Sequence, residues 1–315
     1  MNRGECITWV VPPVRFQQSQ LLSTNATNQE PMWLMGTTYA LGDRVLRQAT
    51  PSTGWMKGVP MLRVFESLVA SNTADPTAEP AKWKDIGPAN SVAMFTSRLA
   101  EQTMRDGDLN VVVSPGAVVT CCAFFGLVGD SITLTVRTAA GDVRSTETKP
   151  LIGRPGVTDW LTFFLAPYEQ ITQALFIPLT CLPGDKLEVT IAGPAVACSR
   201  MSYGQMVDLG WGPDYGATWA MDNYTSSDPD EFGYVDPITR DYAPRNNITF
   251  RVDKARINAT LNTLIALRGT PCLLVGSRDP DYITALVNFG LVRDPSMPIP
   301  RATHADMSFE FKGFV

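Results

Sequence analysis

Apolar and polar side chains alternate along several short segments of this chain, and this alternation is the feature that most restricts its fold. Over Ser131–Arg137 apolar residues take every second position between serine and threonines. A period of two places successive side chains on opposite faces of an extended strand. Turn signals such as Gly129-Asp130 and Gly141-Asp142 separate such segments at intervals of about 8 to 12 residues, a spacing typical of an antiparallel β-sandwich.

The middle of the chain, residues 96–200, is therefore predicted to form a β-sandwich of the jelly-roll type. Further strands are expected at Asn110–Ser114, Ala117–Gly126, Gln173–Leu179 and Lys186–Ile191. Sandwiches of this kind bind sugars or simply contact neighbouring proteins, so the fold alone does not decide the function.

The last segment, 247–315, predicts a small α+β unit. Apolar residues recur at helical spacing over Ala255–Arg268, with Asp253 as the N-cap and Gly269 as the residue that ends the helix. Strands are expected around this helix and at the end of the chain, at Ile248–Val252, Cys272–Val275, Thr284–Val292 and Met307–Phe314. The final alternating strand is of the kind that pairs at a sheet edge, within the chain or with a neighbouring subunit.

Residues 201–247 are rich in glycine and aromatic residues and are predicted to form a long loop, so that 201–315 is an aromatic loop followed by the α+β domain. Long loops in compact proteins are usually functional. Its aromatics suit either a protein interface or a saccharide platform, and the lack of clustered Asp and Asn favours the interface. The candidate residues are Trp211, Trp219, Tyr224 and Tyr234.

The first third of the chain divides into an arm or linker, 1–32, and a small β module, 33–95. A unit of about 60 residues buries little apolar surface, so its core is expected to depend on aromatic residues. Trp55 lies in a Gly-containing loop. It suits either an exposed stacking residue or a contact in an interface or local cap, and the second role is favoured. The predicted core residues of the module are Trp33, Tyr39, Phe65 and Trp83.

These module residues resemble the pattern of type-3 chitin-binding domains. The shared features are a leading Trp33, Tyr39 before Gly42-Asp43, a second aromatic strand and a closing Trp83. The resemblance implies a small carbohydrate-binding fold. In that family an Ala-Lys-Trp-Trp-Thr motif supplies the sugar platform, whereas here Lys84 follows a single tryptophan. This departure favours protein contacts over sugar binding.

The next residues, Ile86–Phe95, contain a Gly-Pro-x-Asn-x-x-Ala-Met-Phe motif. Together with the preceding module, this run is similar to a family of tailed-bacteriophage virion proteins. The resemblance implies a structural component of the tail, tail tip or baseplate, made in the host cytoplasm and located in the virion. It also implies other tail proteins as partners and a homo-oligomeric ring. The alternative is an adsorption protein that binds a host cell-surface glycan.

Composition restricts the partners. The net charge of −5 and the lack of a basic cluster argue against nucleic acid, because phosphate binding needs a basic face. The charged share of 18% is low against the usual share of about 25%, which suits equally surfaces that partners cover and a β-sandwich protein rich in Thr, Ser and Gly. The longest apolar runs, Val111–Val113 and Cys121–Val128, are too short to span a bilayer, so no membrane insertion is expected.

Catalytic signatures are also missing, and we expect no enzyme, no cofactor and no metal site. His304 is the single histidine and is expected at a loop or rim. No nucleophile elbow or Walker loop occurs. The acidic run Asp228-Pro229-Asp230-Glu231 lacks calcium-loop spacing and is interpreted as a solvated loop. A glycan-degrading hydrolase is left as a third hypothesis.

The six scattered cysteines are expected to be free, buried thiols.

Overall fold

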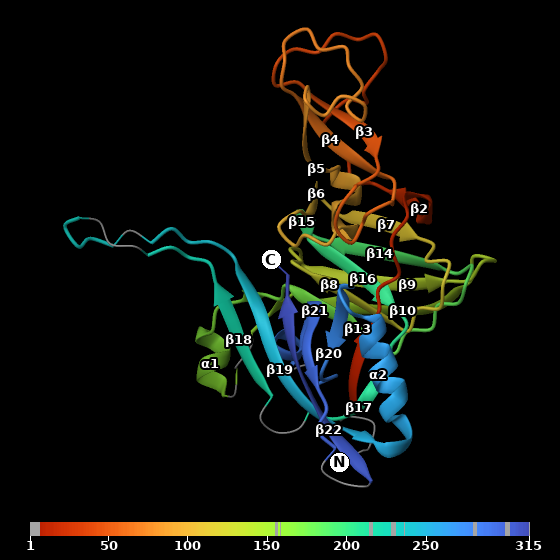
Figure 1. The fold of residues 1–315 in the computed structure, drawn as a ribbon, viewed down its shortest axis with the longest axis vertical. Coiled ribbons are helices and arrows are strands. Elements are labelled where there is room, and N and C mark those ends of the chain that lie inside the picture. Colours follow the sequence, from red (N-terminus) through yellow and green to blue (C-terminus); the bar gives the residue numbers. More distant parts are fainter. Residues whose placement is uncertain are drawn as a thin grey trace. The chain divides into compact units, whose positions relative to one another are not determined.

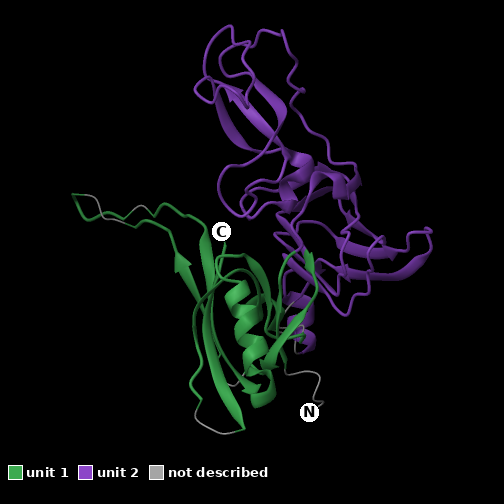
Figure 2. Ribbon diagram, turned by 45° about the vertical axis from the view of Figure 1, so that its right-hand side comes forward, with its two compact units in different colours: residues 1–13, 203–315 green, residues 14–202 purple. Residues whose placement is uncertain are grey.

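The computed structural model of the protein describes residues 7–154, 157, 159–213, 217–227, 231–235, 237–279, 282–299 and 303–314. The fold is mainly β with a small helical part, as the sequence predicts. The chain divides into two compact units (Figure 2). Unit 1 combines the two ends of the chain, Met1–Pro13 and Tyr203–Val315, and unit 2 contains Val14–Ser202.

Unit 1 contains a seven-stranded antiparallel sheet in the order β17-β1-β20-β21-β22-β19-β18 (Figure 1). One additional bridge joins β17 to β19, through Trp211 and Arg251, so that all strands except β18 form a closed ring. The strands are β1 (Ile7–Val11), β17 (Val207–Trp211), β18 (Thr218–Asn223), β19 (Tyr242–Asp253), β20 (Cys272–Val275), β21 (Val287–Ser296) and β22 (His304–Gly313).

The core of unit 1 follows the alternation of its longest strands. β22 buries every second residue along its length, and β19 does so along its second half. The helix α2 (Ile257–Ala266) adds Leu264 to the same core. Other members of this core include Val10, Leu209, Ile248, Phe250, Leu274, Met307, Phe309 and Phe311. The predicted terminal strand and helix are thus present, with a short 3-10 helix, Lys254–Arg256, before α2.

Three details of this region differ from the prediction. Asp253 stands at the N-cap of the short 3-10 helix and not of α2, and its side chain makes no capping hydrogen bond; its carboxylate accepts a hydrogen bond from Trp211 Nε1 at 3.0 Å. The strand expected from Thr284 begins later, since Ile283–Leu286 form the short helix α3. The helix also ends earlier than predicted, at Ala266 with Leu267 as its C-cap, so Gly269, with a φ of +71°, lies one position beyond the residue directly after the cap.

The prediction of a long loop over 201–247 is wrong, because this region contains β17, β18 and the first residues of β19. Its glycines suggested a loop, but Gly210 has a packing role. A Cβ at Gly210 would lie 2.5 Å from the carbonyl oxygen of Arg251. The absence of a side chain therefore lets β17 approach β19 closely.

The predicted N-terminal arm is divided between the two units. Strand β1 lies between β17 and β20 in the sheet of unit 1, where Val10 and Val11 are fully buried. The following residues belong to unit 2, in which Leu21–Thr24 form β2 and pair with β7.

Unit 2 has a sandwich-like β architecture. Its largest sheet has the order β10-β9-β14-β7-β2, and a second sheet has the order β13-β8-β16. The strands of these two sheets are β2 (Leu21–Thr24), β7 (Leu109–Val113), β8 (Cys121–Phe125), β9 (Ser131–Arg137), β10 (Val143–Pro150), β13 (Gln173–Phe176), β14 (Lys186–Ala192) and β16 (Arg200–Gly204), the last two residues of which belong to unit 1. Strands β9 and β14 alternate between buried and half-buried residues, as the period of two predicts.

Smaller sheets complete unit 2. The module sheet has the order β3-β4-β5, and two further pairs are β15-β6 and β11-β12. These strands are β3 (Arg44–Ala49), β4 (Met61–Ser67), β5 (Trp83–Pro88), β6 (Thr103–Asp106), β11 (Ile152–Gly153), β12 (Glu169–Gln170) and β15 (Ala195–Cys198). The helical elements are η1 (Gln18–Gln20), η2 (Asn90–Phe95) and α1 (Trp160–Leu165).

Gly204→Ala is expected to destabilise the protein by about 1 to 3 kcal/mol, the usual cost of overpacking. The new Cβ would lie 2.4 Å from the carbonyl oxygen of Pro12, which is main chain and cannot move aside cheaply. Urea unfolding would measure the change. Gly153→Ala is the control, because its Cβ would meet only side-chain atoms of Ile171, of which the flexible Cδ1 is nearest, at 3.1 Å. Equal losses in the two variants would contradict this account of Gly204.

Candidate functional site

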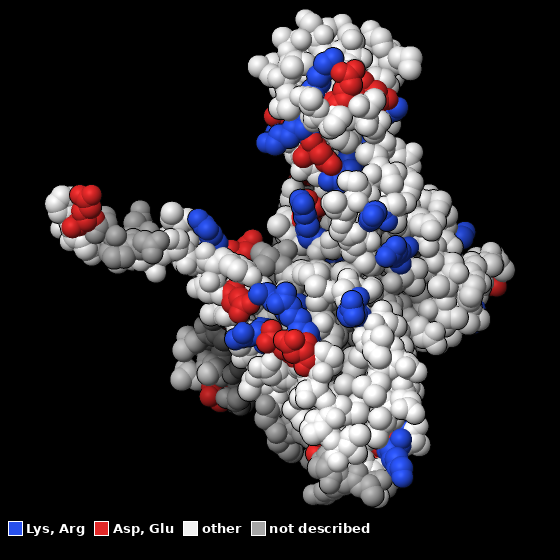
Figure 3. All heavy atoms as spheres, viewed as in Figure 1, with Lys and Arg blue, Asp and Glu red and all other residues white. Residues whose placement is uncertain are grey.

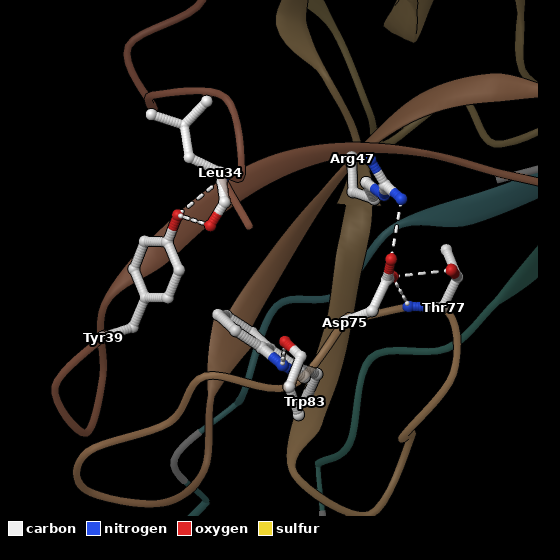
Figure 4. A network of polar contacts seen from close by, with 7 residues as sticks. Leu34, Tyr39, Arg47, Asp75, Thr77 and Trp83 are labelled. Atoms are coloured by element: carbon white, nitrogen blue, oxygen red, sulfur yellow. Dashed lines mark hydrogen bonds and ion pairs between the residues drawn. The ribbon is translucent and has the colours of Figure 1, made fainter. Parts of the chain in front are cut away.

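The four aromatic residues predicted as the module core are all buried and lie in one cluster with Val45. Tyr39 and Trp83 meet edge to face, with ring centroids 5.6 Å apart. Each has a polar partner: Trp83 Nε1 donates to the carbonyl oxygen of Ala74 at 3.0 Å, and the Tyr39 hydroxyl accepts from the Leu34 amide at 2.8 Å (Figure 4). These rings therefore stabilise the module and offer no face to a ligand.

An ion pair fixes the loop between β4 and β5 onto β3. Asp75 accepts hydrogen bonds from Arg47 Nη2 at 2.7 Å and from the amide of Thr77 at 2.9 Å (Figure 4). Partial burial raises the pKa of Asp75, but the hydrogen bonds from Thr77 and the charge of Arg47 outweigh it and lower the pKa. The Arg47 guanidinium also lies over the Trp33 ring, 4.6 Å from its centroid. These contacts are structural.

Trp55 is half-buried and packs against a small cluster of Met56, Val59 and Met61. The guanidinium of Arg200 lies over its ring, 5.4 Å from the centroid. Trp55 therefore has the position of a local cap, and its ring is not an open platform.

Three of the four candidate aromatics of 201–247, Trp219, Tyr224 and Tyr234, lie on or near the β18–β19 hairpin, whose connection extends away from the ring of strands (Figure 1). Trp219 and Tyr242 touch edge to face, with centroids 6.4 Å apart, and both are exposed. Tyr224 is exposed near the end of β18, and Tyr234 is 76% exposed in the connection. Trp211 is separate from them, on β17, where it bonds Asp253.

The largest gathering of exposed aromatic rings on unit 2 was not among the predicted residues. It is helix α1 with the nearby Tyr168, called here the α1 cluster. The exposed fraction is 78% for Trp160 and 73% for both Phe164 and Leu165. The rings contact one another, with Phe163 and Phe164 centroids 5.5 Å apart. A short run that is apolar at nearly every position usually indicates burial, so its exposure could not be predicted from the pattern.

The α1 cluster is held in a defined conformation by polar contacts at its base. Asp159 caps the helix by accepting a hydrogen bond from the Thr162 amide at 2.7 Å, and this bond lowers the pKa of Asp159. The Arg154 guanidinium lies 3.9 Å from the centroid of Tyr168 and 5.3 Å from that of Phe163. The exposed rings therefore belong to a folded element.

Five of the six cysteines lie among the described residues, and each is a buried free thiol, as predicted; Cys6 lies outside them. Burial raises the pKa of Cys181 to about 11 and those of Cys198 and Cys272 to about 12. Burial also raises the pKa of Cys122 well above its usual value. A thiol is nucleophilic only as its thiolate, so these groups are inert near neutral pH.

Other groups with catalytic or ligand chemistry are sparse. His304 begins β22, and its Nδ1 lies 3.0 Å from the Thr303 hydroxyl. Among the described residues, His, Cys, Asp and Glu form no group of three or more that could hold a metal. The acidic run at Asp228–Asp230 lies outside the described residues. Within the described part of the chain, no helix has the length and hydropathy needed to cross a membrane.

Comparison of the chain with protein-family models, with curated proteins and with solved structures finds no match.

In a Cys6→Ser variant, we expect no reaction of the folded protein with a thiol reagent at pH 8, because all five remaining thiols are buried and raised pKa values keep four of them protonated. Absorbance with an aromatic disulfide reagent would report the result. Addition of guanidinium chloride should then release five equivalents, the number of buried thiols. Fast reaction of any thiol before unfolding would contradict the buried arrangement.

Proposed function

We propose that this protein is a structural component of a tailed-phage virion, in the tail, tail tip or baseplate, and that it makes protein–protein contacts in a symmetric assembly. The α1 cluster is the observation that carries this proposal. Its rings, which include Trp160 and Phe164, are mostly exposed although they are large and apolar. Contiguous apolar patches of this kind mark interaction sites when they occur on folded proteins.

The residue types of the cluster suit a protein partner. Trp, Tyr and Phe are enriched in the cores of protein interfaces, and Lys and Glu are depleted there. Burial of apolar area stabilises a contact by roughly 25 cal/mol per Å² before the costs of association. The Asp159 cap satisfies the first turn of α1, so the helix forms without its partner and little ordering cost remains on binding.

A second exposed surface supports a ring of subunits. Trp219, Met221 and Tyr242 are exposed on the β18–β19 hairpin of unit 1, whereas the α1 cluster belongs to unit 2. A cyclic assembly with head-to-tail contacts needs two different patches on each subunit. The resemblance of the run from Trp33 to Phe95 to virion proteins of tailed phages favours a phage tail as the site of that assembly.

The location can be tested directly in phage particles. Mass spectrometry of purified virions should detect this chain in stoichiometric amounts with the tail proteins, and antibody labelling in electron micrographs should mark the tail. Absence of the chain from particles that carry complete tails would overturn the proposal.

The double substitution Phe164→Ser and Leu165→Ser is expected to reduce assembly at least tenfold, because it removes two apolar groups from the α1 cluster. Light scattering after size-exclusion chromatography, at matched concentrations, would measure the change. The thermal midpoint should stay within a few degrees, since exposed substitutions rarely change stability by more than about 0.5 kcal/mol.

Met35→Ser is the matched control for these substitutions. Met35 is 88% exposed in unit 2 but lies outside the α1 cluster. Its assembly should equal that of the unchanged protein. Equal assembly by the α1 variant would show that the cluster is not an interface.

A further inference from the structure

A pocket of about 170 Å³ lies in unit 1 at the end of the sheet, beside β19, β21 and β22. Its polar lining consists of Tyr224, Arg293 and Lys312. Its apolar lining consists of Ala243, Leu291 and Phe314. Figure 3 shows basic and acidic side chains gathered over this part of the molecule. The pocket thus combines cationic donors with an apolar wall.

Positive charge exceeds negative charge at this pocket. Lys312 Nζ lies 2.5 Å from Asp222 Oδ2, and Arg245 Nη1 lies 3.9 Å from Asp222 Oδ1. The hydrogen bond from Lys312 lowers the pKa of Asp222, and the charges of Arg245 and Arg293 add to this effect. Three cations therefore surround one carboxylate. Even if Glu310 is included, cations outnumber carboxylates by three to two.

The guanidinium of Arg293 is available to a ligand. Glu310 lies opposite Arg293 in the register of β21 with β22, yet the two side chains form no ion pair within 4.0 Å. Arg245 also lacks a hydrogen-bond partner at one atom: its Nε is buried and has no partner among the described residues. Lys312 remains protonated near neutral pH, since the hydrogen bond to Asp222 raises its pKa.

We propose that this pocket binds the carboxylate or phosphate group of an anionic ligand. Arg293 supplies the planar pair of donors that matches either oxyanion, Lys312 supplies a second positive charge, and the Tyr224 hydroxyl donates to a remaining oxygen. Phe314 and Leu291 contact the carbon skeleton beside the anionic group. The pocket adjoins the β18–β19 hairpin but shares no residue with the exposed surface Trp219, Met221 and Tyr242, and anion binding is measured separately from assembly, so failure of one proposal is distinguishable from failure of the other.

Isothermal titration calorimetry on the full chain tests the site with three probes: inorganic phosphate, D-glucuronate and the neutral D-glucose. We expect phosphate or glucuronate to bind and glucose not to bind. The anion that binds more tightly shows whether the pocket recognises a phosphate group or a carboxylate group. Binding should weaken as sodium chloride is raised, because salt screens exposed charges. No binding of either anion at millimolar concentration, or equal binding of glucose, would overturn the proposal.

Arg293→Gln is the decisive variant, and it should weaken anion binding by roughly tenfold or more, the usual effect of losing a charged hydrogen-bond donor. Asp222→Asn should strengthen binding, because it removes the competing carboxylate. Arg251→Gln is the control. Arg251 is an exposed arginine on β19, 3.7 Å from Asp306, and does not line the pocket. If Arg293→Gln binds the anion with unchanged affinity while circular dichroism shows an intact fold, this pocket is not the anion site.

Discussion

The pairing of β1 with strands from the last third of the chain is the contact on which the rest of unit 1 depends. β1 pairs with β17 on one side and with β20 on the other, so the ring of strands cannot close without it. This contact joins segments separated by the whole of unit 2, and its loop-closure entropy opposes folding. Burial of Trp9, Val10 and Val11 offsets that cost, since each of these side chains is almost completely removed from solvent.

The register of β19 against β22 then determines which side chains face the core and which face the pocket. Phe311 pairs with Asn246 and is fully buried, whereas its neighbour Lys312 pairs with Arg245 on the opposite face. A slip of one residue would turn the lysine into the core and the phenylalanine into water. The apolar alternation of β22 therefore fixes the charged cluster around Asp222, although none of the charged residues contributes to the core.

Local patterns predicted the elements whose environment repeats regularly along the chain. The bounds of β9, the alternation of β22 and the position of α2 all followed from periodicity, because one face of each packs on a core. Non-local features did not follow. Gly210 suggested a loop, but a glycine is required there because the main chain of β19, a strand distant in the sequence, leaves no space for a side chain. Helix α1 has an apolar sequence and an exposed position, and only the fold could reveal that combination. The pocket lined by Arg293 and Lys312 likewise consists of residues from four separate strands or their ends.

The main chain of Pro13 forms an isolated bridge with that of Gly204, and these residues stand at the two junctions between the units. The points at which the chain leaves unit 1 and returns to it are consequently adjacent. Unit 2 is therefore a domain inserted into unit 1. Its replacement by another domain with neighbouring ends would leave every strand of the ring in place. Recombination at these two positions could diversify one unit of the protein while the other keeps its architecture.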